Sequence, residues 1–301
     1  MGAMGGHFGA RAVIEAGMGN RHFFYTDSPC FMLAFVIVNG YNSGKGGCVC
    51  GRPPSSGYQR FHKMKILTFH DIVSASKTDS NGQMKLFSAL QWMQDCSVLS
   101  FMEDAAFCEW LAANHVTPVV NFRQLEVVRV PSLKEKLTCS TYVYDMQGSF
   151  GYRNTAIYDA QGNPCYKSWV IAAFVNLESG RLSRIPKERQ AALQFPPRLD
   201  MTYGSRKIVL PDTPLTPMAP FRVQRNDIDY NNHVNNAQYI RMALEYLPEA
   251  FQVSGLRVEY KRPVMPGSMI SPSVIYGADT VYVVLAVEET ACCVVEFTAR
   301  S

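Results

Sequence analysis

Residues 227–239 read Asp-Ile-Asp-Tyr-Asn-Asn-His-Val-Asn-Asn-Ala-Gln-Tyr, and they place two carboxylates, four asparagines and a histidine in one short stretch. Asp229, Asn231 and His233 alternate, so an extended backbone would point all three side chains to one side. Apolar residues then recur at helical spacing, at Val234, Ala237, Ile240, Ala243, Leu244 and Leu247. A strand or loop is therefore expected to bring a base, an amide and an acid to the start of a helix. Unpaired N–H groups at that start attract negative charge.

The same plan occurs earlier in the chain. Asp79-x-Asn81-x-Gln83 matches Asp229-x-Asn231-x-His233 at an offset of 150 residues, and Glu126 occupies a context similar to that of Glu259. Each copy has the order strand, helix and four β-rich runs, so each is expected to wrap an antiparallel sheet around one long helix, an α+β arrangement.

The boundaries of these elements follow from periodicity and turn signals. The first copy is expected to hold a strand over 64–74, a helix over about 84–113 with a break, and strands at 119–130, 135–146, 150–160 and 165–177. The second is expected to hold a strand over 219–226, a helix to about Phe251, and strands at 254–264, 268–276, 280–288 and 292–299. Six prolines from 178 to 217, the last of them Pro217, mark a connector. The predicted divisions are an extension (1–63), a first copy (64–178), a linker (179–217) and a second copy (218–301). The extension is interpreted as a flexible tail or an upstream addition foreign to the native product.

Composition limits the classes of function. A formal net charge of +4 over 301 residues does not indicate nucleic-acid binding. No segment approaches the ~20 apolar residues of a membrane span. The nine cysteines lack paired CxxC spacing, so reduced thiols in a cytoplasmic protein are expected, without a metal site.

The two copies differ at one position that matters for chemistry. Gln83 stands in the first copy where His233 stands in the second. Because glutamine cannot titrate, only the second copy is equipped for acid–base catalysis. One catalytic site per chain is therefore expected, with the first copy serving binding or structure. Asp227 is interpreted as a turn or solvent carboxylate rather than a second base.

The motif resembles that of the acyl-acyl-carrier-protein thioesterases of plant plastids and bacteria. The matching residues are Asp229, Asn231, His233, Val234, Asn235, Asn236 and Tyr239, and the two-copy layout from 64 to 299 is similar to that family's double hotdog fold. The resemblance implies hydrolysis of the thioester between a fatty acyl chain and the phosphopantetheine arm of acyl carrier protein. It also implies that no metal or organic cofactor is needed.

Carried over by position, the family's catalytic Asp, Asn and His fall on Asp229, Asn231 and His233. The chain departs from the family where a further glutamate and its neighbouring cysteine are replaced by Pro263 and Val264. Either the site works with three side chains, or Glu259 compensates, since positions 259 and 263 share a strand face if the alternation is unbroken.

The expected reaction needs an activated water and a stabilised oxyanion. Asp229 or His233 would take the proton from water, and Asn231 would orient the water or the carbonyl. Backbone N–H groups from Val234 to Asn236 would face the carbonyl oxygen. An apolar slot for the acyl chain is expected from the first copy, with core packing as the alternative reading of its members Leu86, Leu90, Trp92 and Met93.

Two other functions fit the same sequence. One is an acyl-CoA thioesterase of the same fold, and the other is an acyl-binding protein that does not hydrolyse, which the replacement at Pro263 favours. The intact Asp, Asn and His trio argues against the second, because a binder has no need of titrating groups. The expected partner is acylated carrier protein, with neither nucleic acid nor membrane as a partner, and a homodimer remains open.

Overall fold

The protein is described by a computed structural model over residues 62–63, 65–191 and 193–300. The prediction for residues 1–63 lies outside these residues except for His62 and Lys63. The first copy contains β1 (His62–Lys63), β2 (Leu67–Ile72), α2 (Leu86–Met102), α3 (Ala105–Ala113), β3 (Val116–Val127), β4 (Lys136–Gln147), β5 (Phe150–Tyr158) and β6 (Pro164–Asn176). The connector contains α4 (Lys187–Ala191), β7 (Leu193–Gln194) and β8 (Thr216–Pro217). The second copy contains β9 (Phe221–Arg222), α5 (Asn236–Leu244), β10 (Val253–Tyr260), β11 (Met269–Tyr276), β12 (Thr280–Val287) and β13 (Thr290–Ala299).

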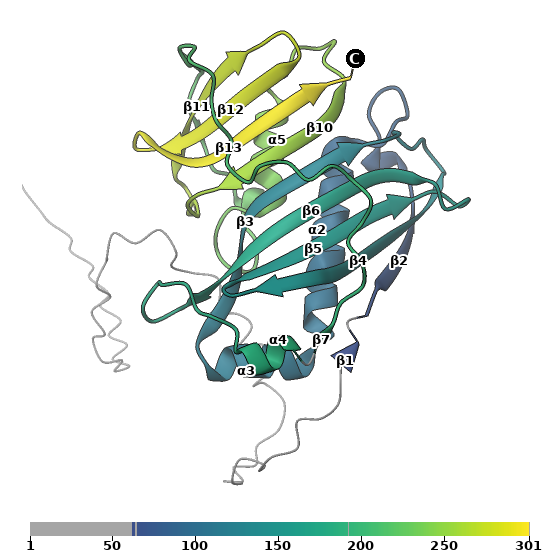
Figure 1. Cartoon of the computed structure of the whole chain (residues 1–301). Helices are drawn as coiled ribbons and strands as arrows, with labels where there is room; N and C mark the ends of the chain where they lie inside the picture. The colour runs from purple at the N-terminus through teal and green to yellow at the C-terminus, as the bar shows by residue number, and fades with distance from the viewer. Residues whose placement is uncertain (1–61, 64, 192, 301) are drawn as a thin grey trace, which may run out of the picture.

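One large sheet runs through both copies (Figure 1). Its order is β2-β4-β5-β6-β3-β10-β13-β12-β11-β8, with β9 also paired to β11. All of these pairings are antiparallel, and the copies join where β3 pairs with β10. The predicted α+β arrangement of two sheet-and-helix copies is confirmed.

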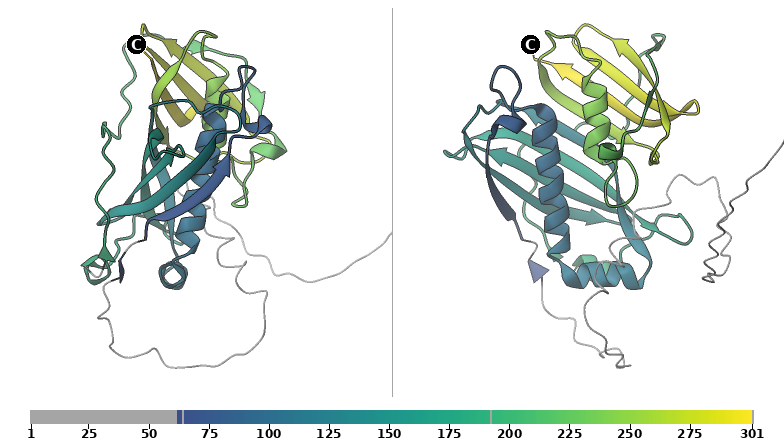
Figure 2. Two further views of the ribbon diagram at one scale, coloured as in Figure 1. Left: turned by 90° about the vertical axis from the view of Figure 1, so that its right-hand side faces the viewer. Right: turned by 180° about the vertical axis from the view of Figure 1, so that it is seen from behind.

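Helices α2 and α5 cover the same face of this sheet and lie side by side (Figure 2). Strand alternation explains why: Leu256 and Val258 of β10 are almost fully buried toward the helices, while Arg257 points to the other face. The buried residues beneath α2 and α5 form one apolar cluster that spans both copies. The two copies therefore share a core.

The connector crosses the opposite face of the sheet, in front of the strands in Figure 1. Gln124 and Glu126 of β3 and Arg257 and Glu259 of β10 bind its backbone between Thr202 and Ile208. Its irregular path agrees with its prolines, which cannot donate a backbone hydrogen bond.

The predicted break in the first long helix is confirmed: α2 ends at Met102, and Asp104 caps α3 by accepting from the N–H of Phe107 (3.1 Å). Two other predicted elements differ from the observed ones. Helix α5 ends at Leu244 rather than near Phe251, shortly before Pro248. The strand predicted over 219–226 shrinks to β9, followed by a 3-10 turn at Arg225–Asp227.

The six cysteines in the described part of the chain are all unpaired. Within the same residues, no helix is long and apolar enough to cross a bilayer.

Candidate active site

The Asp-Asn-His motif folds as a tight turn rather than as an extended strand. Ile228 and Val234 form an isolated antiparallel bridge, and the N–H of Asp229 donates to the carbonyl of His233 (3.0 Å). Asp229 closes the turn by accepting from the N–H of Asn231 at its Oδ1 (2.8 Å). Asn232 takes a φ of 62°, which asparagine tolerates better than most residues. The backbone is therefore not extended here, and the expected alternation of the three side chains does not apply. The turn nevertheless brings Asp229 close to His233.

His233 is 6% exposed, and its ring is oriented by two oxygen acceptors. Its Nδ1 lies 3.3 Å from the carbonyl oxygen of Val234 and 3.7 Å from Oδ1 of Asp229. Both neighbours only accept, so the neutral ring carries its proton on Nδ1. Nε2 then keeps a lone pair that can take a proton.

Asn231 supplies a buried polar atom whose partner is not in the protein. Its Oδ1 is buried and accepts no hydrogen bond within the described residues. An orphaned amide oxygen in the same turn as His233 is suited to accept a hydrogen bond from a water or from a substrate.

The opening of α5 offers fewer free N–H groups than expected. The N–H of Val234 donates to Val264 (2.9 Å), and that of Asn235 donates to Asp227 (2.9 Å). Asn235 is the N-cap, accepting from the N–H of Ala237 (2.9 Å). The proposal that Val234 and Asn235 bind the oxyanion through their N–H groups is therefore wrong. Asn236 alone in that stretch keeps an N–H without a partner in the described residues.

Two tyrosines hold this opening, the buried Tyr239 and the partly buried Tyr260. The hydroxyl of Tyr260 donates to the carbonyl of Asn236 (3.1 Å), and that of Tyr239 accepts from the N–H of Val264 (2.9 Å). Their rings meet edge to face at 5.9 Å, and burial raises the pKa of both hydroxyls, so neither ionises near neutral pH. Tyr260 was not singled out from the sequence. Its position two residues after Val258 and four after Leu256, on the apolar face of a strand, could have indicated that it points toward the helices.

Asp227 is buried, so its interpretation as a solvent carboxylate is wrong, whereas its interpretation as a turn carboxylate is confirmed by its place in the 3-10 turn at Arg225–Asp227. Its Oδ1 accepts from Nη2 of Arg241 (2.8 Å) on α5, and its Oδ2 accepts from the N–H of Gln224 (2.7 Å). This pair ties the segment before the turn to the helix after it.

Glu259 does not join the trio. It lies on the face of the sheet opposite the helices, where Oε1 accepts from the N–H of Ile208 (2.6 Å) and Oε2 from Lys261 (2.5 Å). β10 also ends at Tyr260, so the alternation that would have linked positions 259 and 263 is broken. The substitution of Glu259 for the family glutamate is therefore corrected: its carboxylate holds the connector.

The four expected slot residues sit in the shared core. Leu90 and Met93 are fully buried there, and Leu86 and Trp92 pack at its margin. No group of His, Cys, Asp or Glu side chains in the described part of the chain is arranged to hold a metal ion.

Family models identify the chain's relatives. A model for the acyl-ACP thioesterase N-terminal domain matches residues 68–193, and one for the C-terminal domain matches residues 214–291. Together these matches cover more than half of the chain. The chain belongs to the acyl-ACP thioesterase family.

Individual relatives of this acyl-ACP thioesterase chain are distant. The chloroplastic acyl-[acyl-carrier-protein] hydrolase FATB3 of Cuphea viscosissima is 28% identical over 167 residues, which cover 50% of this chain and 39% of that protein. The chain thus spans about two fifths of that relative's length.

Solved structures support the tandem hotdog fold. An acyl-ACP thioesterase from Bacteroides thetaiotaomicron superposes with a TM-score of 0.70 at 19% identity, covering 78% of this chain and 98% of the other. The 12:0-ACP thioesterase from Umbellularia californica gives 0.69 at 15% identity, covering 78% and 97%. At these identities the likeness shows the fold alone.

The first copy repeats the turn without the histidine. Asp79 accepts at Oδ1 from the N–H groups of Asn81 and Gln83 (both 2.9 Å), and Gly82 takes the φ>0 position (72°) that Asn232 takes in the second copy. The side chain of Gln83 is exposed. This turn is the internal counterpart of the candidate site and serves as its control.

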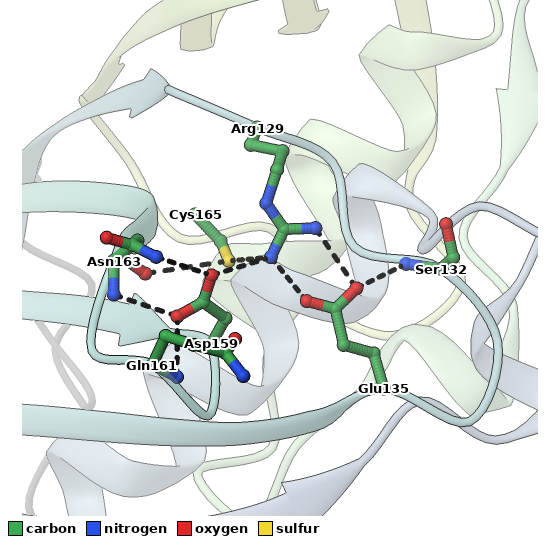
Figure 3. A network of polar contacts seen from close by, with 7 residues as sticks. All are labelled: Arg129, Ser132, Glu135, Asp159, Gln161, Asn163 and Cys165. Carbon is green, nitrogen blue, oxygen red and sulfur yellow. Dashed lines mark hydrogen bonds and ion pairs between the residues drawn. The ribbon is translucent and has the colours of Figure 1, made fainter.

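The segment that follows β3 in the first copy differs from the segment that follows β10 in the second. In the first copy, Arg129 pairs with Glu135 and Asp159 and contacts Sγ of Cys165 (3.2 Å), as Figure 3 shows. The matching backbone site in the second copy holds Arg262, since Cys292 accepts from Lys261 and Arg262 as Cys165 accepts from Val128 and Arg129. Arg262 is exposed and forms no ion pair within the described residues.

Proposed function

We propose that this protein hydrolyses the thioester of fatty acyl-acyl carrier protein to a free fatty acid and the carrier thiol. The proposal rests on family membership and on one observation in particular. The buried Oδ1 of Asn231 has no hydrogen-bond partner within the described residues, and it belongs to the same turn that orients His233. Such an arrangement suits a site that waits for water or substrate.

His233 would act as the general base. Its Nε2 removes a proton from a water molecule while the water oxygen attacks the thioester carbonyl carbon. The carbonyl oxygen becomes an oxyanion beside the free N–H of Asn236 at the start of α5, where the helix dipole favours negative charge. When the tetrahedral species collapses, the C–S bond breaks and the imidazolium returns the proton to the leaving sulfur. The products are the carboxylic acid and the thiol.

Asp229 and Asn231 would support this base. Asp229 lies beside Nδ1 of His233, so its negative charge stabilises the imidazolium and fixes the ring. Asn231 would hold the water by accepting a hydrogen bond from it at Oδ1. Direct proton removal by Asp229 is the alternative assignment.

The carrier protein would dock beside this turn. Arg222, Arg225 and Arg262 lie on the segments that flank residues 227–235, and all three side chains are exposed. None of the three forms an ion pair within the described residues. Acyl carrier proteins are acidic, so these arginines provide complementary charge and a salt-dependent rate of association. An acyl-CoA substrate is the second candidate, because its phosphates would meet the same arginines.

The test is a thiol-release assay with purified protein and matched acyl-carrier-protein and acyl-CoA thioesters. His233→Ala and Asp229→Asn should each lower kcat by about 10²–10⁴-fold, the range for loss of general acid–base catalysis. Gln83→Ala and Asp79→Asn alter the equivalent turn of the first copy and should keep wild-type kcat. If His233→Ala hydrolyses both substrates at the wild-type rate, the assignment of the site is wrong. Binding of acyl chains without any thiol release would instead favour the non-hydrolytic reading. The cytoplasmic location and a possible homodimer stay predictions.

A further inference from the structure

A buried arginine near the candidate site has almost no partner. Arg123 lies on β3, faces α2, and is 3% exposed. Within the described residues, its guanidinium makes one hydrogen bond, from Nη2 to Oε1 of Gln94 (3.3 Å), and its buried Nε has no acceptor. Within the described residues no carboxylate lies within ion-pair distance of it. A buried guanidinium in this state bears a large desolvation cost that its surroundings do not offset.

Other arginines on the sheet are better satisfied. Arg153, also facing α2, donates from Nη1 to the hydroxyls of Ser100 and Thr141 (both 3.0 Å). Arg257 on the opposite face makes two hydrogen bonds with Glu296 (3.0 and 2.5 Å) and one with the carbonyl of Ser205 (3.0 Å). Arg123 therefore differs from these two arginines in its hydrogen bonding, because most of its N–H donors have no acceptor within the described residues.

One hydrogen-bonded side chain connects Arg123 to the start of α5. Gln94, which accepts from Arg123 (3.3 Å), donates from Nε2 to Oδ1 of the N-cap Asn235 (3.4 Å). The guanidinium is thus linked through Gln94 to the residue that precedes Asn236, whose free N–H would face the thioester carbonyl.

Resting on the function proposed above, we infer that the preferred acyl group carries an oxygen close to the thioester, a keto or hydroxyl group, which accepts a hydrogen bond from Arg123. Arginine only donates, so its ligand must accept, and an unsubstituted acyl chain offers no acceptor beyond the thioester itself. A binding site whose buried donor needs an acceptor from the substrate discriminates strongly against a substrate analogue that lacks the matching oxygen.

The experiment compares octanoyl-, 3-oxooctanoyl- and 3-hydroxyoctanoyl-acyl carrier protein as substrates. The wild-type protein should hydrolyse one of the oxygenated substrates with a kcat/KM about tenfold or more above that of the octanoyl substrate, as a charge-assisted hydrogen bond allows. Arg123→Met should bring this ratio to within about twofold of one. Arg123→Lys, which keeps the charge but loses the planar fork, should retain part of the ratio. Arg153→Met removes a satisfied arginine from the same face and should keep the wild-type ratio.

The outcomes separate the inference from the function on which it rests. No thiol release from any of the three substrates by the wild-type protein would contradict the proposed function itself. Release from all three with a wild-type ratio of one or below would overturn the inference alone. The inference also fails if Arg123→Met lowers kcat/KM for all substrates in proportion, because that result assigns Arg123 to the thioester or to the fold. Should Arg123→Met not fold by circular dichroism, the wild-type ratio and Arg123→Lys decide.

Discussion

Gln124 and Arg257 lie directly opposite each other in the β3–β10 pair, and both hold the backbone of the connector. Gln124 donates to the carbonyl of Thr202 (2.7 Å) and accepts from the N–H of Gly204 (2.9 Å), while Arg257 donates to the carbonyl of Ser205 (3.0 Å). The seam that joins the two copies on the helix face is therefore also the place where the connector is attached on the other face.

This attachment predicts that Glu259 contributes to stability and not to turnover. Glu259→Ala would leave the N–H of Ile208, a mostly buried residue, without its acceptor. We expect a loss of about 1–3 kcal/mol in the free energy of unfolding, the cost of an unsatisfied buried group. Urea unfolding measures this loss, and a thiol-release assay should give kcat within about twofold of wild type.

Glu126→Ala is the matched control, because Glu126 accepts from the N–H of Thr202 (2.8 Å) in the equivalent position of the first copy. Both variants should lose stability and keep turnover. If kcat collapsed in Glu259→Ala but not in Glu126→Ala, Glu259 would have to be counted among the catalytic residues.

Tyr260 is expected to position the oxyanion donor. Tyr260→Phe removes the hydroxyl that binds the carbonyl of Asn236 but keeps the ring against Tyr239. The start of α5 would then be less well fixed, so we expect kcat to fall several-fold with little change in KM, because positioning matters most in the transition state. Steady-state kinetics on one acyl thioester provides the measurement.

Tyr166→Phe is the control for this change. Tyr166 is 1% exposed and its hydroxyl has no partner within the described residues, so removing it should leave kcat unchanged and stability equal or higher. Equal kinetic effects in the two variants would show that loss of a buried hydroxyl, rather than the contact with Asn236, is responsible.

Much of the fold was readable from the sequence because both copies repeat the same periodicities. Strands β4, β5 and β6 begin and end within two residues of their predicted bounds. The exchange of Gln83 for His233 also located the candidate site, since residue chemistry does not depend on tertiary packing. Because Leu256 and Val258 alternate with charged residues, the sequence already indicates that Glu259 faces away from the helices.

Other features depended on geometry that spacing does not contain. Asp229 folds its own side chain onto the N–H of Asn231, so a turn forms where alternation alone suggested a strand. The partners of Val234 and Asn235 come from residues 264 and 227, and only the tertiary structure shows that their N–H groups are occupied. Arg123 was one basic residue among many until its burial was known.

The buried pair between Asp227 and Arg241 is expected to support the active-site turn. Asp227→Asn would leave Arg241 without its carboxylate, and because the arginine side chain is 35% exposed, we expect a loss of about 2 kcal/mol rather than the full cost of breaking a buried pair. Thermal unfolding of Asp227→Asn, Arg241→Met and the double variant gives the coupling between the two side chains. Asp71→Asn breaks the more exposed pair with Lys77 in the first copy and should cost less than about 1 kcal/mol. Additive losses at 227 and 241 would contradict the pairing.

The network around Arg129 predicts a specific loss of stability in acid (Figure 3). The hydrogen bond from Arg129 holds the pKa of Glu135 below its ordinary value of 4.5. The folded state therefore binds the proton less readily than the unfolded chain. The contribution of Glu135 is fully present above about pH 4.5 and disappears as the pH falls through its lower folded pKa.

Glu135→Gln removes this titration and should cost about 1 kcal/mol at neutral pH, since the arginine side chain is 42% exposed and the pair is partly screened. Urea unfolding of both proteins from pH 7 to pH 3 should show a constant difference down to about pH 5 and a shrinking difference below it. The shrinking difference distinguishes the titration of Glu135 from a general effect of acid, because a general effect lowers the free energy of unfolding of both proteins equally. A difference that grows as the pH falls would mean that Glu135 binds protons more readily in the folded protein, which the contacts with Arg129 and with the N–H of Ser132 (3.0 Å) exclude.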